Sequence, residues 1–213
     1  MRTAPTISRG KPSARDKILA AAFALIRARG YAATTVDDLC AAAGVTKGAF
    51  FHHFRSKEDL AVAAADHWSE TTRAFFAGAS YHDHADPLDR VLGYIDFRKA
   101  ILKGTVPEFT CLVGTMVQEV YESHPAIRDA VDRSISSHVL TVEADIEEAM
   151  RRYRLDAGWS AASLALHTQA VLQGAFVLAK AKGGAAIAAD SIDHLRRYVE
   201  LLFKNSRRRE ARG

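Results

Sequence analysis

The sequence predicts an all-α protein of nine helices, arranged as a small N-terminal head and a larger C-terminal bundle. Apolar residues recur at helical spacing along the chain, whereas no stretch alternates apolar and polar residues beyond four or five positions. The dipeptides Asn-Gly and Asp-Gly, which mark tight hairpin turns, do not occur. Hydrophobic residues make up 48% of the chain and prolines are few, so a sizeable core can be buried.

Three short helices are expected in the head. Ser13 to Asp16 has the pattern of a capping box, and a helically spaced apolar run follows it. Gly30 ends that helix, because glycine accepts the left-handed conformation of a C-terminal cap. Thr35 to Asp38 opens a second helix in the same way, Gly44 ends it, and Thr46 starts a short third helix.

Six longer helices are expected in the body, separated by polar or proline-containing breaks. Their expected spans are 57–79, 87–103, 108–121, 125–153, 160–181 and 191–203. Pro87 and Pro125 each suit a first helical position, where proline loses no hydrogen bond.

Charge is unevenly distributed along the chain. Residues 1–60 hold ten Lys and Arg against five Asp and Glu, residues 61–203 hold 14 against 19, and residues 204–213 hold five against one. A positive end attracts a polyanion, because phosphate contacts release condensed counterions. For the basic run at 207–212, the alternative interpretation is a solvated tail.

Composition argues against a membrane or secreted protein. No run of 18 apolar residues indicates a membrane span, and Met1 to Lys11 lacks the apolar stretch of a secretory signal. Two cysteines, Cys40 and Cys111, make no disulfide framework. A reducing cytoplasm is therefore the expected location.

Residues 34–60 have the pattern of two short helices joined at Ala43-Gly44-Val45. Apolar positions on both helices can lock them at a steep angle, which leaves the start of the second helix free. An α-helix fits the major groove of B-DNA, and its N-terminal residues reach the base edges. An ordinary helical hairpin with a glycine turn is the structural alternative.

Residues 13–60 closely resemble the N-terminal domain of the TetR family of repressors. The resemblance covers about 50 residues and rests on five segments in register: Ala28-Arg29-Gly30-Tyr31, Thr34 to Leu39, Ala42 to Val45, Lys47 to Phe54, and Ser56 to Leu60. It implies a homodimer of all-helical subunits that binds double-stranded operator DNA and is released by a small-molecule inducer.

The resemblance also assigns roles to residues. It places Thr35 and Lys57 at phosphates, and Thr46, Lys47 and Gly48 in the groove. The chain departs from the family pattern at one position, Phe51.

The family usually has a tyrosine where this chain has Phe51, and the tyrosine hydroxyl commonly donates to a phosphate. Phe51 cannot donate, so this contact is lost or passes to His52. The implied domains are a disordered basic tail (1–12), a helix-turn-helix domain (13–56), a ligand-binding and dimerisation domain (57–204) and a second basic tail (205–213).

The most distinctive part of the body is the stretch Thr110 to Tyr121. It resembles the sixth helix of a TetR subgroup that carries a Cys-Leu-x-Gly motif with Gln-Glu downstream. Gly114 lowers helix stability relative to alanine, which indicates close packing or a pocket wall. Cys111 is either a sensor of oxidants or electrophiles, as in some related repressors, or a buried packing residue.

Seven side chains are candidates for the wall of an inducer pocket. They are Trp68, Tyr94, Phe97, Cys111, Met116, Tyr121 and Phe176. Each of these types is also common in an ordinary helical core. The helix expected at 57–79 connects head and body, so it is the expected lever for release.

Two helices are candidates for dimerisation, those expected at 160–181 and 191–203. The first is rich in small residues, which permit close helix packing, and the second carries one apolar stripe. That stripe consists of Ile192, Leu195, Tyr198, Val199 and Leu202. The alternative is that both are internal core helices.

Other classes of function lack support in the sequence. His82-Asp83-His84 is the densest group of histidines, but it has no partner cysteine or second histidine pair, so no metal site is expected. No Ser/His/Asp motif, phosphate loop or dinucleotide fingerprint occurs, so no enzyme and no cofactor are expected. A constitutive DNA-binding protein and an activator on the same fold remain alternatives to an inducible repressor.

Overall fold

The computed structural model describes residues 12–210 and is helical throughout, without strands in that range. The α-helices are α1 (Ala14–Arg29), α2 (Val36–Ala43), α3 (Lys47–His53), α4 (Lys57–Ala77), α5 (Pro87–Ala100), α6 (Val106–Phe109), α7 (Leu112–Val120), α8 (Pro125–Arg152), α9 (Ala161–Lys182) and α10 (Ala186–Glu210), with a 3-10 helix, η1 (Ser80–Asp83), after α4. The all-α class is therefore confirmed.

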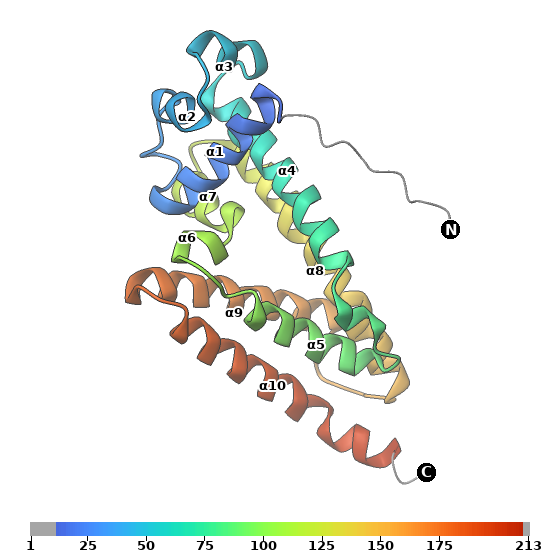
Figure 1. Ribbon diagram of the computed structural model, residues 1–213. Coiled ribbons are helices and arrows are strands. Elements are labelled where there is room, and N and C mark those ends of the chain that lie inside the picture. Colours follow the sequence, from blue (N-terminus) through green and yellow to red (C-terminus); the bar gives the residue numbers. More distant parts are fainter. Residues whose placement is uncertain (1–11, 211–213) are drawn as a thin grey trace, which may run out of the picture.

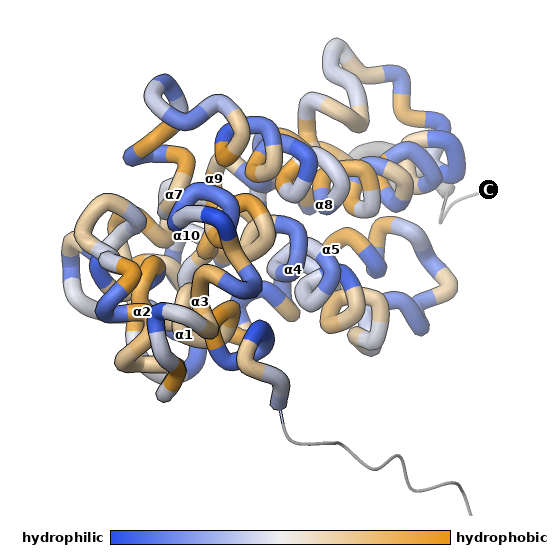
Figure 2. Tube along the Cα trace, turned by 90° about the horizontal axis from the view of Figure 1, so that it is seen from above, coloured by the Kyte–Doolittle hydropathy of each residue, from blue (hydrophilic) through white to orange (hydrophobic). Residues whose placement is uncertain are grey.

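The arrangement has a head and a body. Figure 1 shows α1, α2 and α3 together at one end, with α4 and α8 leading away from them toward α5, α9 and α10 at the other end. Figure 2 shows that hydrophobic and hydrophilic residues are mixed along the helices, as expected where one face packs and the other meets solvent.

The starts of the head helices follow from their capping residues. Ser13 and Thr35 each accept a hydrogen bond from the third helical residue, whose side chain, Asp16 or Asp38, completes the capping box. Gly44 ends α2 in the left-handed conformation, at φ +63°. These predicted boundaries are confirmed within a residue or two.

One expected helix is two helices in the structure. The stretch expected as a helix over 108–121 is divided into α6 and α7 by extended backbone at Thr110 and Cys111. Glu108 does not open a helix but closes the capping box that Thr105 begins. The count is thus ten α-helices in residues 12–210 rather than nine.

The last helix also differs from the expectation. It begins at Ala186 rather than near Ser191, directly after the glycine pair at 183–184. It continues to Glu210, through much of the segment expected as a second basic tail. Residues 1–11 of the expected first tail lie outside the described residues.

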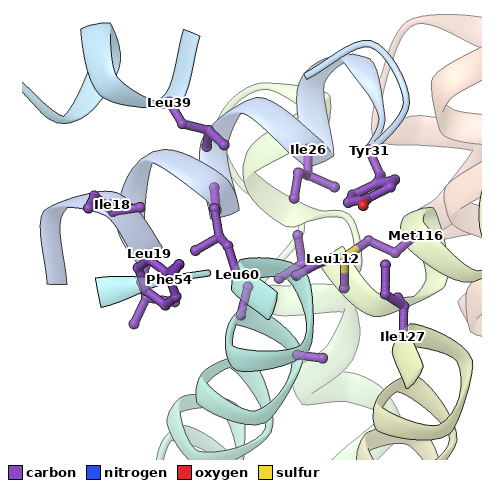
Figure 3. Close-up of a cluster of buried hydrophobic side chains, with 14 of the residues drawn as sticks. Ile18, Leu19, Ile26, Tyr31, Leu39, Phe54, Leu60, Leu112, Met116 and Ile127 are labelled. Atoms are coloured by element: carbon purple, nitrogen blue, oxygen red, sulfur yellow. The ribbon is translucent and has the colours of Figure 1, made fainter. Parts of the chain in front are cut away.

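Head and body share one hydrophobic core. Leu19 of α1, Leu60 of α4 and Leu112 of α7 are all fully buried in the same cluster, together with Ile127 of α8 (Figure 3). A second cluster fills the far end of the body between α5, α8, α9 and α10. The head is therefore packed against the body and does not move on a free linker.

Helix α9 is long and apolar enough to cross a membrane by length and composition, with a mean hydropathy of 1.3 over 18 residues. In the folded chain 44% of that stretch is buried, and α9 packs against both α8 and α10. Helices that pack in the bundle of a folded protein meet the same criteria, and α9 packs in this way.

Candidate nucleic-acid interface and ligand cavity

Helix α3 is held in the head by one side of its surface. Phe50 is fully buried and Phe54 is 3% exposed, and both belong to the cluster that contains Leu39 of α2. The opposite side is open: Phe51 is 54% exposed although its ring packs edge-on against Phe50. His52 is also exposed.

The N-terminal turn of α3 presents the residues expected in a DNA groove. Thr46 caps the helix, its Oγ1 accepting from the Ala49 amide at 3.1 Å. A Cβ placed on Gly48 would meet only Thr46 Oγ1, at 3.7 Å, so no packing within the chain demands glycine there. The turn therefore offers exposed backbone that a nucleic acid can approach closely.

Lys47 lies on the same exposed turn but is paired. Its Nζ is 2.7 Å from Asp37 Oδ1, which raises the pKa of Lys47. Both side chains are well exposed, so the pair is weak and its lysine can exchange the carboxylate for a phosphate.

The two expected phosphate ligands outside α3 are also engaged. The Thr35 hydroxyl donates to Asp38 Oδ2 at 2.6 Å within the capping box of α2. Lys57 Nζ donates to the Tyr31 carbonyl at 3.1 Å and lies 4.2 Å from the centre of the Tyr31 ring. Thr35 has one hydroxyl hydrogen and would have to leave Asp38 to donate to a phosphate, whereas the Lys57 ammonium has further N–H donors.

A cavity of about 260 Å³ lies in the body. Side chains from α4, α5, α6, α7, α8 and α9 line it, most of them apolar or aromatic. A second hollow of about 210 Å³ adjoins it and shares Thr110, Cys111, Gln173 and Phe176 with it. Cavities lined by apolar and aromatic side chains with a few polar groups hold small organic ligands in many proteins.

Three of the seven candidate pocket residues line this cavity. They are Trp68 of α4, Phe176 of α9 and Cys111 at the start of α7. Cys111 is half-buried and caps α7, its Sγ accepting from the Gly114 amide at 3.4 Å. A Cβ on Gly114 would collide with the Gln173 side chain, so this glycine does permit close packing.

The other four candidates lie outside the cavity lining. Met116 is fully buried in the core shared with the head, and Tyr94 and Phe97 pack with other rings around the cavity wall. Tyr121 is 58% exposed beyond the end of α7. The apolar type of these residues does not show which side of its helix each one occupies, and this side decides whether a residue lines the cavity.

Two polar groups of the cavity, Arg98 of α5 and Gln169 of α9, were not expected from the sequence. His138 of α8 also lines it; with His67 and His167 it was one of three helical histidines that could line a pocket or pack in the core. A detectable signal existed for Arg98, because it continues the buried stripe of Val91, Tyr94 and Ile95 on α5. An arginine in such a stripe indicates a buried charge with a role.

A hydrogen-bonded chain joins three of the buried polar groups. Gln169 Nε2 donates to the Tyr94 hydroxyl at 2.9 Å, and that oxygen is 2.9 Å from His138 Nε2. Burial, with the nearby charge of Arg98, lowers the pKa of His138 to about 4. The imidazole is therefore neutral at pH 7.

Two polar contacts connect the cavity walls to the head. Arg27 of α1 donates to the Glu108 carbonyl at 2.9 Å, and its guanidinium lies 5.2 Å from the centre of the Trp68 ring. Glu119 of α7 accepts from the Ala32 amide at 2.8 Å, in the loop between α1 and α2. Helix α7 thus begins at the cavity and ends against the head.

An apolar face on α9 and α10 is left uncovered. Its large exposed residues are Leu166, Val177, Leu178, Tyr198 and Leu201. Ala170 and Gly174 lie exposed between those of α9, and the His167 and Tyr198 rings, 5.4 Å apart, join the two helices. Contiguous exposed apolar surface of this kind marks protein interfaces.

Sequence families match both parts of the chain. Residues 18–64 match the family described as bacterial regulatory proteins, tetR family, and residues 87–197 match the tetracyclin repressor-like C-terminal domain. The second match alone covers just over half of the 213 residues.

Individual proteins agree with these matches. The repressor KstR2 of Rhodococcus jostii is 29% identical over 67% of this chain and 62% of its own length, and the probable regulator ArpR of Pseudomonas putida is 30% identical over 63% and 72%. Over the curated relatives, the matched part spans between 19% and 72% of the relative's length.

A solved TetR transcriptional regulator from Chloroflexus aurantiacus superposes with a TM-score of 0.75 at 28% identity, covering 87% of this chain and 93% of its own. These matches agree with the exposed N-terminal turn of α3 and with the helical body. The chain is a transcriptional regulator of the TetR family, with an N-terminal helix-turn-helix DNA-binding domain.

Proposed function

We propose that this regulator is a ligand-released repressor, which binds an inverted-repeat operator as a homodimer through α3 and leaves it when a small molecule occupies the cavity of the body. The observation that carries the proposal is the position of α7. Its N-cap residue, Cys111, lines the cavity, and Glu119 near its other end accepts a hydrogen bond from Ala32 in the loop between α1 and α2. The printed name of KstR2, a transcriptional repressor, supports the sign of regulation.

The exposed turn of α3 supports DNA reading. Thr46 and Gly48 present a helix start without a covering element, and free amides at a helix start attract phosphate. In a two-fold dimer, two such helices enter successive major grooves roughly 34–36 Å apart, or a little more. The operator is then an inverted repeat with both half-sites on one face of the duplex.

The uncovered face of α9 and α10 supports the homodimer, but it includes only Tyr198 of the five residues of the predicted apolar stripe. Leu195 and Val199 of that stripe are buried inside the subunit, where they pack in the far core. Leu178 and Leu201, by contrast, are 45% and 63% exposed. These outward residues are the proposed contact surface, and the chain is proposed to act in the cytoplasm.

The contacts between cavity and head support release. A ligand changes DNA affinity only through its different affinity for the two spacings of the heads. Trp68 on α4 and Cys111 on α7 both line the cavity, and both helices pack against α1. A ligand that displaces these helices would move the head and separate the two α3 helices beyond the groove repeat.

The operator can be obtained by selecting bound duplexes from random DNA with the purified protein. We expect an inverted repeat, and light scattering should report about twice the 23.3 kDa chain mass. A reporter gene behind that operator distinguishes a repressor, which lowers transcription, from an activator. A stable monomer at micromolar concentration, or selected sites without symmetry, would contradict the proposal.

A further inference from the structure

We propose that the cavity takes a carboxylate attached to an aromatic or other flat apolar body, and that Arg98 binds the carboxylate group. This inference rests on the proposed function, because it names the chemical class of the small molecule that would occupy the same cavity.

Arg98 is a buried charge without a counterion. Its side chain lines the cavity, the residue is 9% exposed, and its Nε has no hydrogen-bond partner. The ion pairs among the side chains of residues 12–204 do not include it. Arg90, two turns earlier on the same helix, is paired with Asp145 at 2.7 Å and with Glu148. A buried guanidinium without such a partner is strongly disfavoured, so its site is completed by an anion.

Aromatic rings surround the Arg98 guanidinium, and its Nε is left without a hydrogen-bond partner. Its Cζ lies 5.3 Å from the ring centre of Phe76, 5.6 Å from that of Phe176 and 6.0 Å from that of Tyr94. Ring faces attract a cation but accept no strong hydrogen bond from its N–H groups. A carboxylate accepts two such bonds in the plane of the guanidinium.

A second orphaned donor lines the same cavity. Thr110 is 1% exposed and its Oγ1 has no hydrogen-bond partner. Buried hydroxyls without partners are rare, and this one lies in the break between α6 and α7 that also positions Cys111. A ligand oxygen would satisfy it.

The other ionisable groups of the lining do not neutralise Arg98. The Glu108 carboxylate is held by the Thr105 amide and hydroxyl at 2.6 and 2.7 Å, which lowers its pKa and ties it to the cap of α6. His138 is neutral at pH 7. The interior therefore carries one uncompensated positive charge, and apolar rings such as Phe75 and Phe109 surround it.

The test compares acids with their neutral amides in a protein whose only tryptophan is Trp68, which lines the cavity. Trp159 packs on Phe203 away from it and is changed to Phe. The probes are benzoate, 3-phenylpropanoate and 4-phenylbutanoate, each against its primary amide, followed by fluorescence and calorimetry. We expect at least one acid to bind at least tenfold more tightly than its amide.

Variants assign the preference to Arg98. In Arg98→Met the acid and its amide should bind within twofold of each other, and Arg98→Lys should restore part of the preference. Arg133→Met is the matched control, because Arg133 is 61% exposed on the surface of α8, and it should keep the full preference. Equal binding of acids and amides by the wild type, or binding of neither, would overturn the proposal.

Two further readouts separate this proposal from its alternatives. Ligand-free Arg98→Met should unfold at or above the wild-type temperature, since it removes an unpaired buried charge; a drop of several degrees would make Arg98 a structural residue and overturn the proposal. Operator release is measured in parallel. Acid preference without release supports the inference and contradicts regulation by this cavity, whereas release by the amides alone supports regulation and contradicts the inference.

Discussion

Acidification from pH 7 to pH 5 is expected to destabilise the folded protein through His138. The Tyr94 hydroxyl accepts from Gln169 and lies 2.9 Å from His138 Nε2. A second proton on the ring places a charge in a buried site next to the Phe76 ring and beside the charge of Arg98. The folded protein therefore resists protonation of the ring.

The sign and size follow from linkage. The pKa of His138 is about 4 in the folded protein and 6.5 for the ordinary side chain. The unfolded chain thus takes the proton first, so the stabilising contribution is fully present above pH 6.5 and is lost as pH falls toward 4. Between pH 7 and pH 5 these values correspond to a loss of about 2 kcal/mol from this one group.

Urea unfolding of the wild type and of His138→Gln at pH 7, 6 and 5, at one protein concentration, measures this loss. The glutamine keeps a hydrogen-bonding group but does not titrate. The wild type should lose about 2 kcal/mol more than the variant across the range. Parallel pH profiles for the two proteins would refute a neutral, buried His138.

Three further predictions concern the reading helix, the dimer and Cys111. Gly48→Asp should abolish operator binding in an anisotropy titration while circular dichroism stays unchanged, because it sets a carboxylate where phosphate approaches; wild-type affinity would remove α3 from the groove. Leu201→Glu should give folded monomers in light scattering, whereas the buried Leu195→Glu should unfold the chain, and a dimeric Leu201→Glu protein would contradict the proposed face. Cys111→Ser, which keeps a capping side chain on α7, should respond to a thiol-reactive electrophile as the wild type does; loss of operator release in this variant alone would make Cys111 a sensor.

Local patterns in the sequence were sufficient to predict the head. Its caps at Ser13, Thr35 and Thr46 use residues three positions apart, and both partners are visible in the sequence. The Thr105 to Glu108 box has the same form but was missed, because the apolar run after it appeared continuous. That continuity hid the break at Thr110, which shapes the cavity.

The body could be predicted only in part, because its cavity depends on which way each helix faces. Six helices contribute to the lining, and sequence spacing does not fix their mutual rotation. Helix α10 shows the difficulty, since Leu195 and Leu201 are both apolar but face the core and the solvent respectively. The unpaired charge of Arg98 likewise becomes visible only when its surroundings are placed in space.

The most direct test of control by the cavity needs no knowledge of the ligand. Ser134 is 7% exposed and lines the cavity from α8, so Ser134→Phe places a ring inside it, while Ser136→Phe puts the same ring on the exposed side of the same helix. Operator affinity of both variants and the wild type is measured by fluorescence anisotropy, with dimer and fold checked in parallel. If occupation of the cavity releases DNA, Ser134→Phe should bind the operator about tenfold more weakly than the wild type, within the usual range of such coupling, and Ser136→Phe should bind normally. Equal operator affinity of a folded, dimeric Ser134→Phe protein and the wild type would contradict release through this cavity.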